Sequence, residues 1–300
     1  MPYRNLYIAH PARISCRSAQ LLMCTDCEHS VPLEDIAAVM VEDRQTSITA
    51  AALSMLAQSG ISVYFCDEKH TPCGVLLPFL QHSRQTGMLS AQTALSLPAK
   101  KRLWQQIVTA KIRNQAECLS LCGKGDAAGW LYSRSNAVNS GDSENMEAVA
   151  AAYYFPALFG ADFVRGNEAD ARNSALNYGY AILRGAIARA LTAYGFLPSL
   201  GLHHCSELNA FNLADDLIEP FRPVVDLFVA GNVAAAAEMN PALKGQLFNL
   251  LNVDIALSGK HYSVAYAAEL CAQNLQKCYR EKAAVLSLPL LLELRQHTYE

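Results

Sequence analysis

The sequence predicts an α+β fold, with a small N-terminal β-rich domain joined by a linker to a larger all-α C-terminal domain. Two observations predict this division. Short β-branched and aromatic segments separated by polar residues occupy residues 1–84, whereas long Ala- and Leu-rich segments with helical spacing follow in residues 98–300. Residues 85–97 between them contain Ser, Thr, Gln and Gly, which is typical of a linker.

The composition is that of a globular protein with an ample core, because 52% of the 300 residues are apolar and 17% are charged. The first ten residues lack the charged-then-apolar pattern of a secretion signal. The apolar run at residues 283–292 is too short to span a membrane and is interrupted by Ser287 and Pro289. We therefore expect a cytoplasmic protein without a membrane segment, in which the ten cysteines are reduced thiols.

The first domain is expected to contain several short strands and one helix. The segment Thr49–Gln58 is rich in Ala, Leu and Met and predicts a helix, with Ser47 as its cap and Gly60 at its end. The segment Ile61–Cys66 is β-branched and aromatic and predicts a strand. Further apolar patches predict strands at residues 6–8, 14–16, 21–23, 31–33 and 36–41.

Four cysteines of this domain raise the question of a zinc site, because Cys24 and Cys27 form a C-x-x-C pair. The second pair, Cys66 and Cys73, is more widely spaced than a zinc knuckle. Cys66 also completes an apolar strand, where a thiol is an ordinary small hydrophobic group. We therefore interpret all four as structural thiols, with zinc as the alternative.

Residues 69–116 contain no acidic residue, although the whole chain carries a net charge of −3. Lysine and arginine recur through this basic window, which predicts a face that contacts phosphate groups. The alternative is an ordinary solvated helix surface. A long amphipathic helix begins at Pro98 within the window, with Leu103, Ile107 and Asn114 on its buried face and the cations on its other sides.

The segment Met146–Phe159 is apolar nearly all round and predicts a buried helix. Glu147 is the one charged residue in it. A carboxylate at the start of a buried helix must be paired, protonated or bound to a metal ion. Arg165 is the partner that a purely structural interpretation of Glu147 predicts.

A helix predicted at residues 173–194 leads into a loop that presents His203 and His204. Asp216 and Glu219 follow three residues apart, so both carboxylates would project from one face of a helix. An imidazole with carboxylates and no thiolate suits a hard divalent ion such as Mg²⁺ or Mn²⁺ better than a structural zinc ion. The alternative is a solvated acidic helix start, where negative charge favours the positive end of the helix dipole.

Motifs in order along nearly the whole chain resemble the CRISPR-associated integrase of the adaptation machinery, the "Cas-one" family, in particular its type II branch. They are DIAAVMVED, ITAAALSMLAQSGISVYFCD, WQQIVTAKIRNQ, EAVAAAYYFPALFG, NSALNYGYAILRG, LPSLGLHH and NLADDLIEPFRPVVD. The resemblance implies an N-terminal β-rich domain that forms a homodimer and a larger helical catalytic domain.

The resemblance also implies the site. It places the catalytic, metal-binding residues on Glu147, on His204 in the G-x-H-H loop and on Glu219 in the D-L-x-E-P-F-R-P motif. Asp216 then has a supporting or second-metal role, and His203 shapes the loop. The implied cofactor is Mg²⁺ or Mn²⁺.

The implied activity is that of a metal-dependent DNA integrase with associated endonuclease activity. The 3′-hydroxyl of a captured DNA fragment attacks a CRISPR repeat in one transesterification step, so no protein nucleophile is needed. The implied partners are double-stranded DNA, a second copy of the chain and the small "Cas-two" protein. We expect the DNA phosphates to be contacted by Arg84, Lys100, Lys101, Arg102, Lys111, Arg113, Arg165 and Arg184.

Three other functions stay open at this point. A metal-dependent nuclease acting on branched DNA would use the same site, with water as the attacking group. A non-catalytic DNA-binding scaffold would need the acids only as a helix start. A small-molecule metallohydrolase would leave the basic window unexplained.

Overall fold

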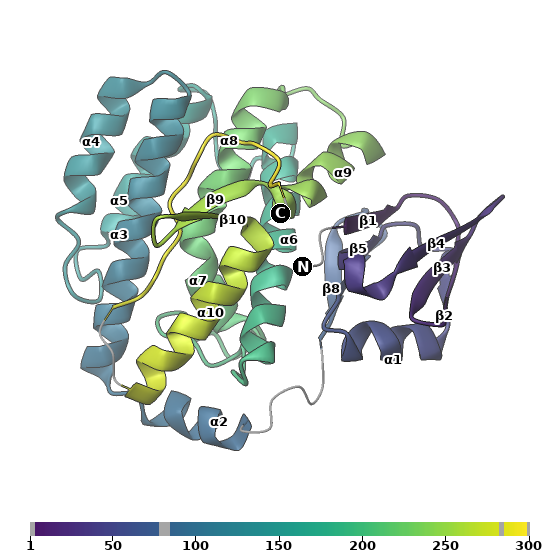
Figure 1. The fold of residues 1–300 in the computed structure, drawn as a ribbon. Coiled ribbons are helices and arrows are strands. Elements are labelled where there is room, and N and C mark those ends of the chain that lie inside the picture. Colours follow the sequence, from purple (N-terminus) through teal and green to yellow (C-terminus); the bar gives the residue numbers. More distant parts are fainter. Residues whose placement is uncertain (1–3, 78–84, 282–284, 299–300) are drawn as a thin grey trace.

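A computed structural model describes residues 4–77, 85–281 and 285–298 of the chain. The N-terminal part contains two four-stranded sheets and a helix, and the C-terminal part is largely helical (Figure 1). The predicted fold class, a β-rich region followed by a larger helical one, is therefore confirmed. The domain boundaries stay a prediction, and Arg84 lies outside the described residues.

The first sheet has the strand order β1-β5-β7-β8. Its strands β1 (Arg4–Ile8), β5 (Ile36–Val41) and β7 (Ser62–Cys66) run parallel, and β8 (Pro72–Leu76) is antiparallel to β7. The central strand β5 reads IAAVMV and is buried along nearly its whole length. Such continuous apolar runs are typical of strands that are covered on both faces.

The second sheet has the order β4-β3-β2-β6. The strands β2 (Arg13–Arg17), β3 (Gln20–Cys24) and β4 (Glu28–Pro32) form an antiparallel meander, and the short β6 (Ser47–Ile48) pairs parallel with β2. Apolar side chains from the two sheets and helix α1 form one core. This core includes Ile14, Leu21, Val39, Leu56 and Val63.

Helix α1 (Ala50–Gln58) begins after Thr49, whose hydroxyl accepts a hydrogen bond of 3.2 Å from the N–H of Ala52. The predicted cap, Ser47, is wrong because that residue lies in β6 and pairs with β2. The predicted end is right: Gly60 follows the helix with φ of +69°, a conformation that glycine adopts without strain.

Two long helices, α3 and α6, form the centre of the helical part. Helix α3 packs on α4, α5, α8 and the 3₁₀ turn η2, while α6 packs on α7, α8, α9, α10 and the strands β7 and β8. The helices are α2 (Gln85–Ala94), α3 (Leu97–Leu121), α4 (Gly125–Ser135), α5 (Met146–Phe159), α6 (Ala171–Ala193), α7 (Asn212–Ile218), α8 (Arg222–Asn232), α9 (Pro241–Asn249) and α10 (Val264–Glu281), and the 3₁₀ turns are η1 (Leu33–Asp35), η2 (Glu219–Phe221) and η3 (Leu250–Asn252).

The segment predicted as a linker contains helix α2, which lies against the helical part (Figure 1). Met88 and Gln92 are buried on one face of this helix, four residues apart. The Gln92 side chain donates to the carbonyl of Leu197 and accepts from its N–H, at 3.1 and 2.9 Å. Residues 85–94 of the predicted linker are therefore helical and packed, while the linker assignment itself stays a prediction.

The description of the C-terminal part as all-α also needs correction, because β9 (Asp254–Leu257) and β10 (Lys260–Ser263) form an antiparallel hairpin. Its two-residue turn, Ser258-Gly259, has positive φ at both positions, as in the tight turns that match the twist of a hairpin. Residues 285–298 are not helical and form isolated bridges with the hairpin region. Apolar runs of this length are ambiguous between strand and helix, which is why the sequence pattern was misleading.

The sheets and helices meet at Tyr64, which is fully buried. Its hydroxyl donates to the carbonyl of Ile182 in α6 at 3.1 Å, and its ring stacks edge-on with Phe248. Nearby, Glu42 accepts from Lys244 of α9 at 2.6 Å and from Tyr7 at 2.7 Å. Apolar contact and paired buried charge thus hold the N-terminal sheet on the helices.

Gly185 makes this packing possible, since a Cβ there would lie 2.2 Å from the Tyr64 ring. We expect Gly185→Ala to lower the free energy of unfolding by about 1–3 kcal/mol, because a fully packed ring must shift. Gly129→Ala in α4, where nothing lies within 4 Å, is the matched control and should be neutral or stabilising. Urea unfolding followed by circular dichroism measures both, and equal stability of the two variants would contradict the expectation.

Candidate active site

The predicted acids Glu147 and Glu219 meet at a lysine. The ammonium of Lys111 lies 2.7 Å from Oε1 of Glu147 and 2.5 Å from Oε2 of Glu219. The side chains are 11% exposed for Lys111, 23% for Glu147 and 4% for Glu219. Arg222 adds a second cation, with its Nε 3.0 Å from Oε1 of Glu219. Three segments far apart in the sequence thus place their charges at one buried point.

Lys111 was predicted to contact DNA phosphates from a solvent face of the long helix, and this placement is wrong. The residue lies four positions after Ile107 and three before Asn114, so helical spacing puts it on the buried face. The sequence contains this spacing, but the prediction for Lys111 was based on the positive charge of residues 69–116 and not on the helical spacing. Arg165 does not pair with Glu147 either, because its guanidinium donates to Asn173 and Asn177.

Burial opposes the charge on both members of the central pair, and their mutual attraction overcomes it. Desolvation lowers the pKa of Lys111, but the charges of Glu219 and Glu147 raise it overall. Desolvation likewise favours protonated Glu219, yet Lys111 and Arg222 hold the pKa of its carboxyl below the ordinary value. Both groups are therefore charged at neutral pH.

Helix α5 brings Glu147 to this point, and two buried acids hold the helix. The carboxylate of Asp142 accepts hydrogen bonds from the N–H groups of Met146 and Glu147, at 2.8 and 3.0 Å, and so caps the first turn. Further along, the hydroxyl of Tyr154 donates to Asp226 of α8 at 3.0 Å. Neither acid was singled out from the sequence.

The structure gives Asp216 a supporting role, the first of the two roles that were predicted. Its buried carboxylate accepts hydrogen bonds from three consecutive N–H groups of the loop, those of Leu202, His203 and His204. Both oxygens are thereby used, so Asp216 folds the histidine loop rather than sharing a cation with Glu219. The backbone comes this close because residue 201 is glycine, where a Cβ would lie 2.2 Å from the carbonyl oxygen of His204.

Asp216 also orients the His204 ring, whose Nδ1 lies 2.8 Å from Oδ1 of the acid. A carboxylate only accepts hydrogen bonds, so Nδ1 carries the hydrogen and Nε2 is the ligand or base in the neutral ring. The hydrogen bond to Asp216 raises the pKa of His204 despite its partial burial. His203 stacks on the buried Trp104 with ring centroids 4.3 Å apart, which fixes the loop as predicted for that residue.

The donors suit a hard divalent cation only in part. Two carboxylates, a partly buried one and a buried one, already face one cation, and Oε2 of Glu219 accepts no well-aligned hydrogen bond from it. The negative charge of Glu219 contributes to the raised pKa of His204, after the hydrogen bond to Asp216. Among the described residues, however, no three His, Cys, Asp or Glu side chains come close enough together to hold a metal ion. The structure therefore joins Glu147 to Glu219 and leaves His204 outside their immediate set.

The remaining predicted DNA contacts lie in different surroundings. Lys101, Arg102 and Arg113 are exposed on α3. Lys100 donates to the carbonyl of Gly201 at 3.3 Å, beside the histidine loop. A phosphate contact by any of these cations stays a prediction.

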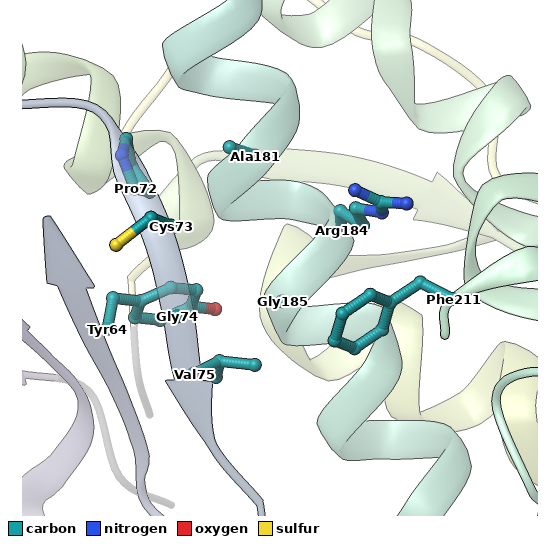
Figure 2. Close-up of a pocket in the computed structure, with 9 residues that line it drawn as sticks. All are labelled: Tyr64, Pro72, Cys73, Gly74, Val75, Ala181, Arg184, Gly185 and Phe211. Carbon is teal, nitrogen blue, oxygen red and sulfur yellow. The ribbon is translucent and has the colours of Figure 1, made fainter. Parts of the chain in front are cut away.

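Arg184 lines a cavity of about 110 Å³ between strand β8 and helix α6 (Figure 2). Its guanidinium lies over the ring of Phe211, 5.0 Å from the centroid. One terminal nitrogen donates to Asn209 and to Asp215, at 2.7 and 2.8 Å. The predicted DNA-binding cation is thus already paired, and Asp215 serves as its counter-charge.

The four cysteines considered for zinc lie in two different sheets. Cys24 and Cys27 lie at the β3–β4 hairpin, while Cys66 and Cys73 lie at the β7–β8 hairpin of the other sheet. Described cysteines do not join any group of three metal-ligating side chains.

The sequence is similar to proteins of a known family. Residues 6–238 match the family described as CRISPR associated protein Cas1. The CRISPR-associated endonuclease Cas1 of Neisseria meningitidis serogroup C (strain 8013) is 46% identical over 305 aligned residues, which cover the whole of both chains.

Two solved structures share the fold. A casposase bound to an integration product superposes with a TM-score of 0.73 at 20% identity, over 94% of this chain and 92% of that one. A chain of a Cas6-RT-Cas1–Cas2 complex superposes with a TM-score of 0.69 at 20% identity. The superposition covers 94% of the present chain and 35% of the chain in the complex. The fold is therefore that of a casposase and of Cas1 proteins.

The family match and the full-length relative are specific beyond the fold. The chain belongs to the CRISPR-associated Cas1 family, as its motifs predicted.

The His204–Asp216 pair predicts a pH dependence of stability. Folding raises the pKa of His204, so the pair stabilises the folded chain fully below the unfolded-state pKa of about 6.5, and this stabilisation is lost as pH rises through the folded-state pKa. In EDTA, we expect His204→Gln to melt at a lower temperature than the wild type. This difference in melting temperature should be larger at pH 5.5 than at pH 9. His261→Gln, an exposed position on β10, is the control. A deficit that grows toward pH 9 would contradict the assignment.

Proposed function

We propose that this chain is a metal-dependent DNA integrase that inserts captured foreign DNA into a CRISPR array, with associated endonuclease activity. One observation carries the proposal: Glu147 and the buried Glu219 converge on a single cation, Lys111, in a chain where Asp216 holds the imidazole of His204 in one tautomer. Membership of the Cas1 family supports it, and so does the shared fold with a casposase bound to an integration product.

The carboxylates of Glu147 and Glu219 would hold Mg²⁺ or Mn²⁺, and Nε2 of His204 would complete the set. A divalent ion in such a site polarises a phosphate and favours attack by an oxygen nucleophile. Asp216 keeps the His204 ring turned so that Nε2 is free. Arg222 holds the second carboxylate in place through Oε1 of Glu219. The attacking 3′-hydroxyl belongs to the captured DNA, so the chain itself contributes no nucleophile.

The partners of the proposed reaction are double-stranded DNA, a second copy of the chain and a small Cas2 protein. The solved complex named above contains Cas1 together with Cas2, which supports such a partner here. The full-length relative from Neisseria meningitidis supports placing the chain in the type II branch. Among the described residues no helix is long and apolar enough to cross a membrane. A cytoplasmic location belongs to the proposal.

A structure-specific nuclease is the second candidate, because the Neisseria relative is named an endonuclease. The same acids and imidazole would serve it, with water in place of the 3′-hydroxyl. The two activities differ only in their product, which is either a joined branch or a cut strand.

Strand transfer into a supercoiled plasmid with a leader and repeat tests the proposal, in the presence of the chain, its Cas2 partner and a duplex with free 3′-hydroxyls. We expect Mn²⁺-dependent joining that is abolished in Glu147→Gln and in His204→Gln. Asp216→Asn should reduce it about 10–100-fold, the usual effect of removing the group that orients a ligand. Glu144→Gln, an exposed acid near Glu147, is the control. Cutting without joining would favour the nuclease, and joining by Glu147→Gln would remove the site assigned here.

The exposed cations of α3 predict a salt dependence of DNA binding. We expect the combined change of Lys101, Arg102 and Arg113 to Gln to weaken binding at all sequences. The slope of log K against log salt should become shallower by about 0.9 for each phosphate that the variant no longer neutralises. Arg17→Gln, an exposed cation on β2, is the control. Fluorescence anisotropy with a labelled duplex at several salt concentrations measures the slope. An unchanged slope would exclude these three cations from the DNA interface.

A further inference from the structure

Lys111 occupies the place between Glu147 and Glu219 that a bound cation would need. Its ammonium lies within 2.7 Å of one carboxylate oxygen from each acid. Divalent ions coordinate carboxylate oxygens at about 2.0–2.6 Å, so an ion bridging the same two oxygens and this ammonium cannot both be present. Lysine and divalent ion are therefore alternatives at this point.

The surroundings hold the backbone of Lys111 in place, but its ammonium group lies at the end of a flexible side chain. Its helix is anchored by Asn114, which donates to the carbonyls of Pro220 and Pro289 at 2.7 and 2.9 Å. The ammonium itself stands at the end of a four-carbon stem with rotatable bonds, which can swing away without moving the helix. Glu219 keeps Arg222 as a partner when the lysine leaves, and its Oε2 has no aligned hydrogen bond to give up.

The two acids need such a cation while no metal ion is bound. Buried carboxylates that face each other repel, and breaking a buried pair leaves an uncompensated charge. The lysine supplies the missing positive charge from within the chain, so Glu147 and Glu219 remain in position. An ordinary structural ion pair joins one cation to one acid. Here a single ammonium neutralises two acids from different segments.

We propose that Lys111 is a built-in counter-ion that holds Glu147 and Glu219 in position in the metal-free protein and competes with the divalent ion for them. The inference rests on the proposed metal-dependent function and assigns to Lys111 a positioning role toward that metal. Lys111, predicted from the sequence to contact DNA, thereby belongs to the metal site. Metal loading requires the ammonium to leave.

Lys111→Met tests the competition, because methionine has a similar length and no charge. In EDTA we expect the variant to melt at a lower temperature than wild type. With Mn²⁺ we expect a larger rise in melting temperature than in wild type, and a Kd for Mn²⁺ lower by on the order of tenfold, measured by calorimetry or by the Mn²⁺ electron paramagnetic resonance signal. Lys111→Arg keeps the charge and should not gain affinity. Lys101→Met, an exposed lysine on the same helix, is the control.

A second measurement uses the wild-type protein, in case Lys111→Met does not fold. Acetylation by a water-soluble reagent, followed by mass spectrometry, reports how accessible each lysine is. We expect Mn²⁺ to increase the acetylation rate of Lys111 relative to that of Lys101, because the displaced ammonium enters solvent. Slower or unchanged acetylation with Mn²⁺ bound would overturn the proposal.

The outcomes separate this inference from the proposed function. Mn²⁺ binding that disappears in Glu219→Gln but is equally strong in wild type and Lys111→Met would overturn the competition and leave the proposed metal site intact. Weaker binding by Lys111→Met would do the same. Mn²⁺ binding by neither protein would overturn both. Tighter binding by Lys111→Met, with faster acetylation of Lys111 in wild type, is the result expected.

Discussion

The helical part of the chain depends on one buried cluster of charges. Lys111 from α3 touches Glu147 from α5 and Glu219 from η2, and Arg222 at the start of α8 touches the latter acid. Because a buried charge without a partner is strongly unfavourable, these segments cannot separate without large cost. The groups that hold the helices together are thus the same groups that form the candidate active site, which couples its geometry to the stability of the fold.

Each acid of the segment NLADDLIEPFRPVVD has its own partner, which explains why so many can be buried together. Asp215 pairs with Arg184, Asp216 binds the histidine loop, and Glu219 faces Lys111. Asp226 receives the hydroxyls of Tyr154 and Tyr180, while burial raises its pKa to about 6. The division arises because α7 ends at Ile218 and a 3₁₀ turn begins at Glu219, before a proline that has no N–H to continue the helix.

This separation of roles bears on the chemistry. The acids that meet at Lys111, Glu147 and Glu219, are distinct from the acid that folds the histidine loop, Asp216. Asp216 orients the imidazole of His204, whereas Glu147 and Glu219 meet at Lys111. The exposed cations of α3 lie on the same helix as Lys111, so one element carries positive charge on its surface and also balances the acids inside.

The sequence alone determined the β-rich and helical regions, most strands of the first 66 residues, the long helices and the family, because hydrophobic periodicity and ordered motifs are local properties. It also marked Glu147, His204 and Glu219. It misled on the hairpin at residues 254–263 and on α2, where apolar runs are short or polar residues become buried. Only the tertiary structure decided that Lys111 pairs with Glu147 and Glu219 and that Asp216 binds the histidine loop. Charge composition records how many cations a segment has, whereas their partners depend on which distant segments fold against them.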